Sequence, residues 1–216
     1  TDNHAISTSK LFVTFLIGKL SIPQKKTYFC KMICTNCPRR CETDRNTKLG
    51  YCHTSATPEV ASICIHKGEE PPISGHKGIC NIFFAHCNLN CCYCQNHEIS
   101  SSIVDSKYVF YNGMEEIVSR IVELLPACDN IIGLVSPTQY SHIIPELIER
   151  IRSHREKPTV VYNSNGYDDP SQLRALSPYV DVYLPDYKYA DAEIAHRYSK
   201  ATLYPEIVLE SLKEMY

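Results

Sequence analysis

The residues of this chain best suited to chemistry are its cysteines. The 216-residue sequence contains 12 of them, and nine fall into two short groups. In the second group Cys87, Cys91 and Cys94 follow one another with a C-x3-C-x2-C spacing. Three thiolates from one short loop can hold three irons of a cubane cluster, and the fourth iron then stays open to a small molecule. The spacing therefore predicts an open iron–sulfur site.

Two neighbours of these cysteines are weaker candidates for ligands. Cys92 directly follows Cys91, and because two successive residues rarely point at the same metal, we interpret Cys92 as a buried bystander. His86 directly precedes Cys87. Its imidazole either tunes a neighbouring cluster by hydrogen bonding or only fills space.

The first group offers a closed set of thiolates. Cys34, Cys37, Cys41 and Cys52 supply four ligands, and Cys30 can replace any one of them. A closed set suits a structural zinc or a 4Fe-4S cluster that relays electrons, and the spacing does not separate the two. The alternatives are unligated buried thiols, or disulfides, which prefer partners that close longer loops.

The elements that must position these groups are clearest from residue 80 onward. Apolar strands are predicted at 81–86, 130–136, 159–163 and 180–184, and helices at 115–125, 141–154, 170–176 and 205–216. This alternation predicts an α/β fold of about four βα units on a parallel sheet, curled into a partial barrel or a doubly wound sheet. We divide the chain into an unassigned segment (1–29), a cysteine-rich knuckle with a Pro- and Gly-rich connector (30–79) and the α/β core (80–216).

Polar residues stand at the end of each predicted strand. They are Cys87, Ser136-Pro137-Thr138, Asn163-Ser164-Asn165-Gly166 and Asp186-Tyr187-Lys188. Parallel strands present their carboxyl ends at one edge of a sheet. We therefore expect these residues to meet on one rim.

The cysteine motif, together with these strand ends, resembles the radical S-adenosylmethionine (SAM) superfamily. The resemblance rests on CNLNCCYC, in which Tyr93 takes the aromatic place before the last cysteine, and it extends through NIIGLVSPTQY, VVYNSNGY and VDVYLPDYKYAD. These segments look like a branch close to the pyruvate formate-lyase activating enzymes. The similarity covers roughly residues 34–216, nearly the whole chain after its first segment.

The resemblance implies an enzyme with two cofactors. Cys87, Cys91 and Cys94 would hold a 4Fe-4S cluster, and SAM would bind its open iron. A flavodoxin or ferredoxin would supply one electron, and SAM would then yield a deoxyadenosyl radical that abstracts hydrogen from a substrate, such as the glycine of a partner protein. The Cys34–Cys52 group would hold a second 4Fe-4S cluster or zinc. No side chain is singled out as the catalytic hydrogen carrier.

The same resemblance implies which other residues contact SAM. They are Tyr93, Ser136, Thr138, Asn163, Asp186 and Lys188. The sequence departs from the family at Ser136-Pro137-Thr138, where many members carry a Gly-Gly-Glu stretch that binds the SAM amino group. Hydroxyl groups and backbone carbonyls can still accept a hydrogen bond from an ammonium. The simpler interpretation of Asp186 and Lys188 is a salt bridge on a solvated loop.

Composition narrows the remaining possibilities. The formal net charge is −2, which argues against a dedicated nucleic-acid binder, and the longest apolar run, 11–18, is too short to span a membrane. We expect a cytoplasmic enzyme. The alternatives are a non-catalytic zinc module and a thioredoxin-like protein built on Cys91–Cys94. A radical SAM core usually has six βα units, so a truncated, inactive form of such an enzyme is a further alternative.

Overall fold

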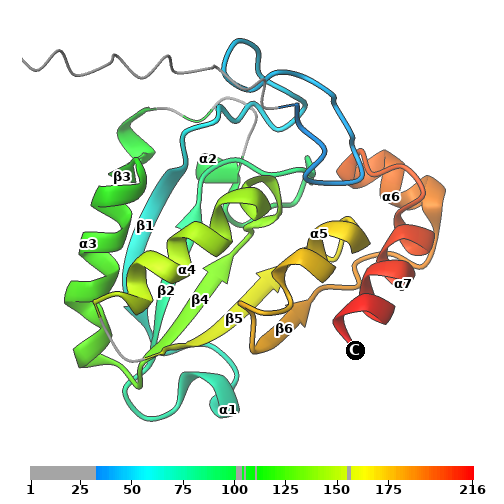
Figure 1. Ribbon diagram of the computed structural model, residues 1–216. Helices are drawn as coiled ribbons and strands as arrows, with labels where there is room; N and C mark the ends of the chain where they lie inside the picture. The colour runs from blue at the N-terminus through cyan, green and yellow to red at the C-terminus, as the bar shows by residue number, and fades with distance from the viewer. Residues whose placement is uncertain (1–32, 101–103, 105, 110, 155–156) are drawn as a thin grey trace, which may run out of the picture. The chain divides into compact units, whose positions relative to one another are not determined.

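The computed structural model describes residues 33–100, 104, 106–109, 111–154 and 157–216. Its centre is a six-stranded mixed sheet with the strand order β3-β1-β2-β4-β5-β6 (Figure 1). The predicted segment 1–29, the apolar run 11–18 and Cys30 lie outside the described residues. In the described part, no helix is long and apolar enough to cross a membrane.

Four strands form the parallel half of the sheet, and they match the four that the sequence predicts. They are β2 (Ile79–Phe84), β4 (Ile131–Val135), β5 (Thr159–Ser164) and β6 (Val182–Pro185). Neighbouring strands pair in parallel, as Ile82 does with Leu134 and Val135 with Asn163. The apolar, β-branched runs of β2, β4 and β5 are mostly buried, which favours this arrangement. The alternation of strands and helices is therefore confirmed.

Two further strands correct the prediction. The Pro- and Gly-rich connector, predicted as the second part of 30–79, contains β1 (Glu59–His66) and the short helix α1 (Pro71–Ser74). The strand β1 pairs antiparallel with β2 and with β3 (Tyr111–Asn112). The Pro and Gly residues that suggested a connector cluster after His66, and they terminate β1 without disturbing it. The sheet consequently has six strands rather than four.

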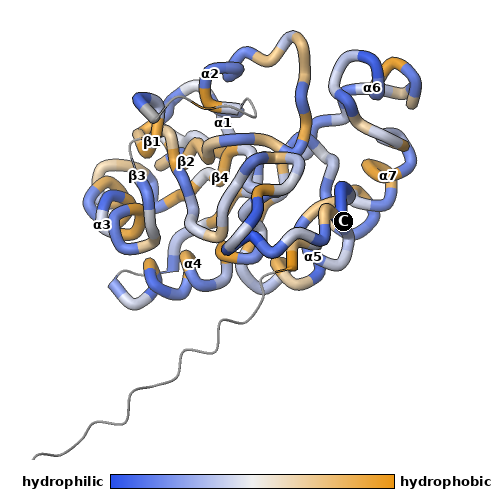
Figure 2. The backbone as a smooth tube through the Cα atoms, turned by 90° about the horizontal axis from the view of Figure 1, so that it is seen from above, coloured by the Kyte–Doolittle hydropathy of each residue, from blue (hydrophilic) through white to orange (hydrophobic). Residues whose placement is uncertain are grey.

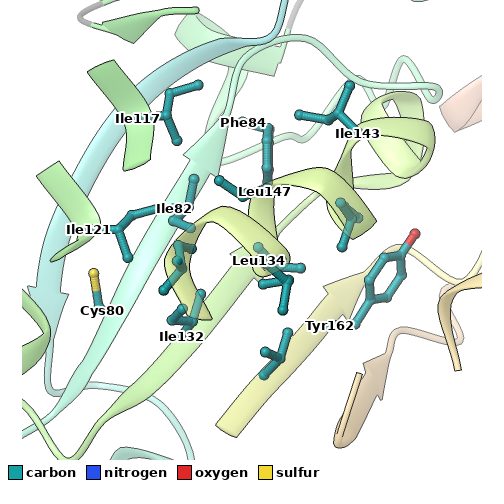
Figure 3. Packing of buried hydrophobic residues seen from close by; sticks show 14 of the residues in the cluster. Cys80, Ile82, Phe84, Ile117, Ile121, Ile132, Leu134, Ile143, Leu147 and Tyr162 are labelled. Atoms are coloured by element: carbon teal, nitrogen blue, oxygen red, sulfur yellow. The ribbon is translucent and has the colours of Figure 1, made fainter. Parts of the chain in front are cut away.

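Three helices cover one face of the sheet and bury the main core. They are α3 (Met114–Leu124), α4 (Ile144–Arg152) and α5 (Pro170–Leu176). Figure 3 shows Ile117, Ile121 and Leu147 packed against Ile82 and Leu134 of the strands. Burying each such side chain contributes about 1.5–3 kcal/mol. In Figure 2 hydrophobic residues gather in β1, β2 and β4, whereas α3 alternates between hydrophobic and hydrophilic residues, as a half-buried helix must.

Short elements complete the chain around this core. They are α2 (His97–Ser100) and the 3-10 turns η1 (Ser106–Tyr108), η2 (Leu125–Ala127) and η3 (Thr138–Ile143). The predicted helix 141–154 therefore begins as a 3-10 turn, and α4 proper starts at Ile144, directly before Pro145. Proline is favoured in the first turn of a helix.

Two helices after β6 form a second, smaller core. The helix α7 (Tyr204–Met215) was predicted, whereas α6 (Ala192–Ser199) was not. The side chain of Asp191 caps α6 by accepting a hydrogen bond from the backbone N–H of Ile194. Ala195, Tyr204 and Val208 of these helices are buried together with Leu89 and Tyr167. This contact places α6 and α7 beside the loop that carries the second cysteine group.

Candidate functional site

Cys87, Cys91 and Cys94 lie on the loop between β2 and α2, and all three line one cavity. The cavity has a volume of about 490 Å³. From the other parallel strands it is lined by Val135, Ser136, Asn163, Ser164, Asn165, Asp186 and Lys188. The structure thus brings the ends of β2, β4, β5 and β6 together around three thiols, as the rule for parallel sheets requires.

The cysteine loop leaves β2 through a left-handed residue. His86 has φ 66°, its backbone N–H donates to the carbonyl of Ile99 at 2.6 Å, and its Nε2 lies 2.9 Å from a carboxylate oxygen of Glu59. The buried side chain of Gln139 donates to the carbonyls of Ala85 and His86 at 3.1 and 2.9 Å. His86 therefore holds the turn and is not among the residues that line the cavity.

Each of the three sulfurs has a polar partner. The backbone N–H of Leu89 and the Nδ2 of Asn165 each donate to Cys87 Sγ at 3.4 Å. The hydroxyl of Ser199 donates to Cys91 Sγ at 2.9 Å, and the hydroxyl of Ser100 lies 3.0 Å from Cys94 Sγ. Hydrogen-bond donors around sulfur stabilise the thiolate form that binds metal.

Burial opposes this effect in the absence of metal. It raises the pKa of the Cys87 thiol to about 12, and the hydrogen bonds from Leu89 and Asn165 only partly offset it. Burial also raises the pKa of Cys91, whereas the Ser199 hydrogen bond and the charge of Lys188 lower it. Such thiols need a strongly cationic partner to ionise, and metal binding supplies one while releasing the protons.

The donor set fits a cluster better than a single ion. Among the described residues, no three His, Cys, Asp or Glu side chains converge closely enough to hold one metal ion. A zinc ion needs each sulfur about 2.3 Å away, whereas a cubane spreads its cysteines over separate irons. Cys92, which we expected to be buried, is exposed, and its backbone N–H donates to the carbonyl of Tyr198. It does not line the cavity, which leaves three cysteines facing it.

Most of the residues implied as SAM contacts also line the cavity. Ser136 has φ 53°, and its backbone N–H donates to the carbonyl of Asn163 at 2.9 Å, so β4 and β5 are joined at their ends. Lys188 Nζ donates to Asp186 Oδ2 at 2.5 Å on the loop after β6. Tyr93 is 53% exposed, and its hydroxyl lies 2.5 Å from that of Tyr189.

Thr138 is the exception, because it serves a buried carboxylate instead. Its hydroxyl donates to Asp168 Oδ1 at 2.7 Å, and the hydroxyls of Tyr162 and Ser164 donate to the same carboxylate at 2.9 and 2.6 Å. Asp168 is 1% exposed, and burial raises its pKa while the three hydroxyls oppose that rise. Thr138 therefore shares the Asp168 carboxylate with Ser164 of the cavity wall and does not itself line the cavity.

Two asparagines that the sequence did not single out as ligands hold the cysteine loop against β5. Asn88 is fully buried, and its Nδ2 donates to the carbonyl of Tyr167 at 2.7 Å. Asn165 donates to Asn88 Oδ1 at 2.8 Å as well as to Cys87. Gly166 follows with φ 76°, and a Cβ there would lie 2.4 Å from the carbonyl of Asp186. The Asn-Gly turn thus lets β6 approach the loop closely.

The first cysteine group is more enclosed than the second. Cys34, Cys37 and Cys52 are 5–7% exposed, and Cys41 is half-buried. Burial raises the pKa of Cys37 to about 12, and negative charge on Cys52, Cys34 or Cys41 would raise it further. All described cysteines are free thiols, so none of these forms a disulfide with another.

Polar side chains of this group, among them Asn36, Arg39 and Arg45, dock it onto the α/β core. Arg45 is 2% exposed and donates to the carbonyl of Gln139 at 2.7 Å, and Asn36 donates to the same carbonyl at 3.2 Å. Arg39 donates to the carbonyl of Asn88 at 3.0 Å, and its guanidinium lies 3.9 Å from the centre of the Tyr51 ring. The two cysteine groups are consequently joined through Arg39 and the cysteine loop itself.

Comparison with known proteins agrees with this geometry. The model of the radical SAM superfamily matches residues 81–216. An uncharacterised protein of Methanocaldococcus jannaschii is 28% identical over 180 residues, which cover 81% of this chain and 51% of the relative. The chain thus spans about half the length of the curated relative that it matches. The matched region contains the cysteine loop and every strand end that lines the cavity.

Proposed function

The chain belongs to the radical SAM superfamily, and from this premise we propose that Cys87, Cys91 and Cys94 bind a 4Fe-4S cluster whose open iron takes SAM. When bound, the reduced cluster and SAM supply a deoxyadenosyl radical that abstracts hydrogen from a substrate. A single observation supports the proposal most directly. Three thiols from one loop face one cavity together with the carboxyl ends of three neighbouring parallel strands.

The charged residues of the cavity suit the two ends of SAM. Asp186 and Lys188 lie side by side on its wall, with the Lys188 ammonium 2.5 Å from the Asp186 carboxylate. A carboxylate attracts the sulfonium and amino groups of SAM, and an ammonium attracts its carboxylate. We propose that this pair exchanges part of its mutual contact for contacts with SAM, which costs little because Asp186 is 55% exposed in side-chain area.

The uncharged residues are assigned positioning roles. Ser136 and Asn163 offer hydroxyl, amide and carbonyl groups at the ends of β4 and β5, and Tyr93 offers an exposed ring beside the last cysteine. We propose that Ser136 and Asn163 hold the polar part of SAM and that Tyr93 packs against its apolar surface. Thr138 has an indirect role. Its hydrogen bond holds the Asp168 carboxylate in place, and that carboxylate orients the hydroxyl of Ser164.

We propose that the Cys34–Cys52 group holds an accessory centre. Its four thiols come from one short segment, yet among the described residues they do not form a ready-made site for a single ion. This arrangement favours a second 4Fe-4S cluster over a zinc ion, because a cluster separates its cysteines more widely. Iron and zinc analysis of the purified chain tests this choice. Zinc as the sole metal, in place of iron, would contradict it.

A narrower proposal concerns the substrate and the electron donor. The resemblance to the activating enzymes supports a partner protein in which a glycine loses hydrogen, and a cytoplasmic flavodoxin or ferredoxin as the electron donor. This step rests on the sequence resemblance alone. It is tested by mixing the loaded chain, SAM and a candidate partner and by recording the electron paramagnetic resonance (EPR) signal of a glycyl radical on that partner.

The central experiment is anaerobic reconstitution of the full chain with iron and sulfide. We expect a brown protein with about four irons at the Cys87–Cys94 site. With dithionite and SAM it should release 5′-deoxyadenosine and methionine in equal amounts. A chain that binds a cluster but releases no 5′-deoxyadenosine under these conditions would contradict the proposed reaction. A chain that takes up no cluster would contradict the proposed site.

A further inference from the structure

The carboxyl end of α6 reaches the cysteine loop and touches one of its sulfurs. Ser199 is the last residue of α6 and is fully buried. Its hydroxyl donates to Cys91 Sγ at 2.9 Å. Ser199 is 108 residues away from Cys91 in the sequence and lies outside the strand ends that carry the other site residues. It is also not among the residues that line the cavity, so it approaches the sulfur from the protein side.

The hydroxyl of Ser199 is the inner end of a row of three hydrogen-bonded hydroxyl groups. The hydroxyl of Tyr189 lies 2.5 Å from Ser199 Oγ, and the hydroxyl of Tyr93 lies 2.5 Å from that of Tyr189. Because the Ser199 hydroxyl donates its hydrogen bond to sulfur, its oxygen can accept one from the Tyr189 hydroxyl, whose oxygen can in turn accept one from Tyr93. Hydrogen bonds in such a chain polarise and strengthen one another. The three hydroxyls therefore present one strengthened hydrogen-bond donor, that of Ser199, to the Cys91 sulfur.

Backbone contacts fix Ser199 in this position. The N–H of Asn90 donates to the carbonyl of Ser199 at 3.1 Å, and the N–H of Cys92 donates to the carbonyl of Tyr198 at 2.9 Å. Lys200 then turns into the left-handed conformation and ends the helix. The residues on both sides of Cys91 are thus bonded to the last turn of α6. These bonds hold the two backbone segments together and so keep the hydroxyl of Ser199 within reach of the Cys91 sulfur.

We infer that Ser199 is a positioning residue that raises the reduction potential of the cluster held by Cys91, an inference that rests on the proposed function. A hydrogen bond to a ligating sulfur stabilises the more negative, reduced cluster, and hydrogen bonds to sulfur are one of the means by which proteins set cluster potentials. A buried donor is effective because no water replaces it. Tyr189 acts through Ser199 and has a smaller effect in the same direction.

The test is a potentiometric titration of the reconstituted full chain, followed by the EPR signal of the reduced cluster. Ser199→Ala should make the cluster harder to reduce. At a fixed potential the ratio of reduced to oxidised cluster should fall roughly fivefold, as expected for loss of one hydrogen bond of ordinary strength. Ser199→Thr, which keeps the hydroxyl, should restore the wild-type ratio, and Tyr189→Phe should lower it by a smaller factor.

The matched control is Ser211→Ala, because Ser211 is also fully buried but donates to the carbonyls of Asp168 and Ile207 instead of to a sulfur. It should leave the potential unchanged. A Ser199→Ala chain with full iron content and the wild-type potential would overturn the inference. If Ser199→Ala takes up no cluster, a wild-type potential in Tyr189→Phe overturns it instead. Failure of the wild-type chain itself to bind a cluster would count against the proposed function and is recognised before any variant is compared.

Discussion

The two cysteine groups use the same side chain for opposite arrangements. Cys87, Cys91 and Cys94 stand on a loop at the end of a parallel strand, and their sulfurs face a cavity lined by three other strands. Cys34, Cys37 and Cys52 are folded inward, each less than a tenth exposed, in a segment with no strand of the main sheet. The difference shows that the number of cysteines does not decide whether a site is open. What decides it is whether the thiols are presented at the edge of a sheet or enclosed by their own loop.

The largest expected effect separates Cys91 from its neighbour. Cys91→Ala should abolish SAM cleavage and lower the iron content, because two thiols cannot retain a cluster that needs three. Cys92→Ala is the control: Cys92 is exposed and lies outside the cavity, so activity should stay within about twofold of wild type. The measurements are 5′-deoxyadenosine release and iron content. Equal activity in both variants would remove the distinction between ligand and bystander.

The enclosed group should respond to substitution through stability rather than through SAM. Cys37→Ala removes a buried thiol from the closed set and should destabilise the chain by at least about 1 kcal/mol, which lowers Tm by roughly 2–4 °C. The spectral change of the other cluster on SAM addition should persist. Cys64→Ala, on the half-buried face of β1, is the comparison. If Cys37→Ala abolished the response to SAM while Tm stayed unchanged, the roles of the two groups would be exchanged.

The sequence predicted the parallel half of the sheet because its strands are short apolar runs, each followed by polar residues. It missed β1 because the Pro and Gly residues after His66 outweighed the alternating pattern of EVASICIH. It also missed α6, whose eight residues include only two large apolar side chains, Ile194 and Tyr198, and both are exposed. A helix held by its cap and by backbone contacts carries little periodic signal.

Residues of the site that follow directly from a strand can be predicted from the sequence, whereas residues that meet through long-range contacts cannot. The end of a strand can be recognised from the local sequence, and parallel strands end at the same edge of a sheet. These two facts predict that Ser136, Asn163 and Asp186 lie at one cavity, as they do. The contact of Ser199 with Cys91 joins residues 108 positions apart, and no local pattern indicates such a pair. Thr138 lies outside the cavity lining because a strand end also has a buried side, where its hydroxyl donates to Asp168.

A smaller effect concerns the charged pair of the open site. Asp186→Ala and Lys188→Ala should each weaken SAM binding about tenfold, the scale of one charge-assisted hydrogen bond, with cluster content unchanged. The exposed Glu210–Lys213 pair on α7 offers a control, since Glu210→Ala removes a similar ion pair that does not line the cavity. The affinity is measured by the change in the EPR spectrum of the reduced cluster as SAM is added. If the affinity for SAM were unchanged in both variants, Asp186 and Lys188 would form only a surface salt bridge with no role in SAM binding.

The smallest expected effect is on the contact between the two groups, and it depends on pH. His142 Nδ1 lies 2.7 Å from the Nδ2 of Asn36, at the point where the first group docks on η3. Burial, aided by the charge of Arg45, lowers the pKa of His142 to about 4. In the unfolded chain the imidazole takes up its proton near pH 6.5, so between pH 6.5 and 4 the unfolded state binds more protons than the folded state. This difference makes the folded chain less stable as the pH falls through that range.

A glutamine at position 142 keeps an acceptor for Asn36 but cannot be protonated. Below pH 6.5 the free energy of unfolding of wild type should therefore fall faster than that of His142→Gln, by at most about 1.4 kcal/mol per pH unit. All other titratable groups are the same in both chains, so the difference between the two profiles isolates the imidazole. Hydrogen exchange then locates the loss: protection should fall first in residues 34–54 and only later in residues 87–94. Parallel profiles, or equal loss in both segments, would mean that the two cysteine groups are not separable folding units and that the docking at His142 does not control the enclosed one.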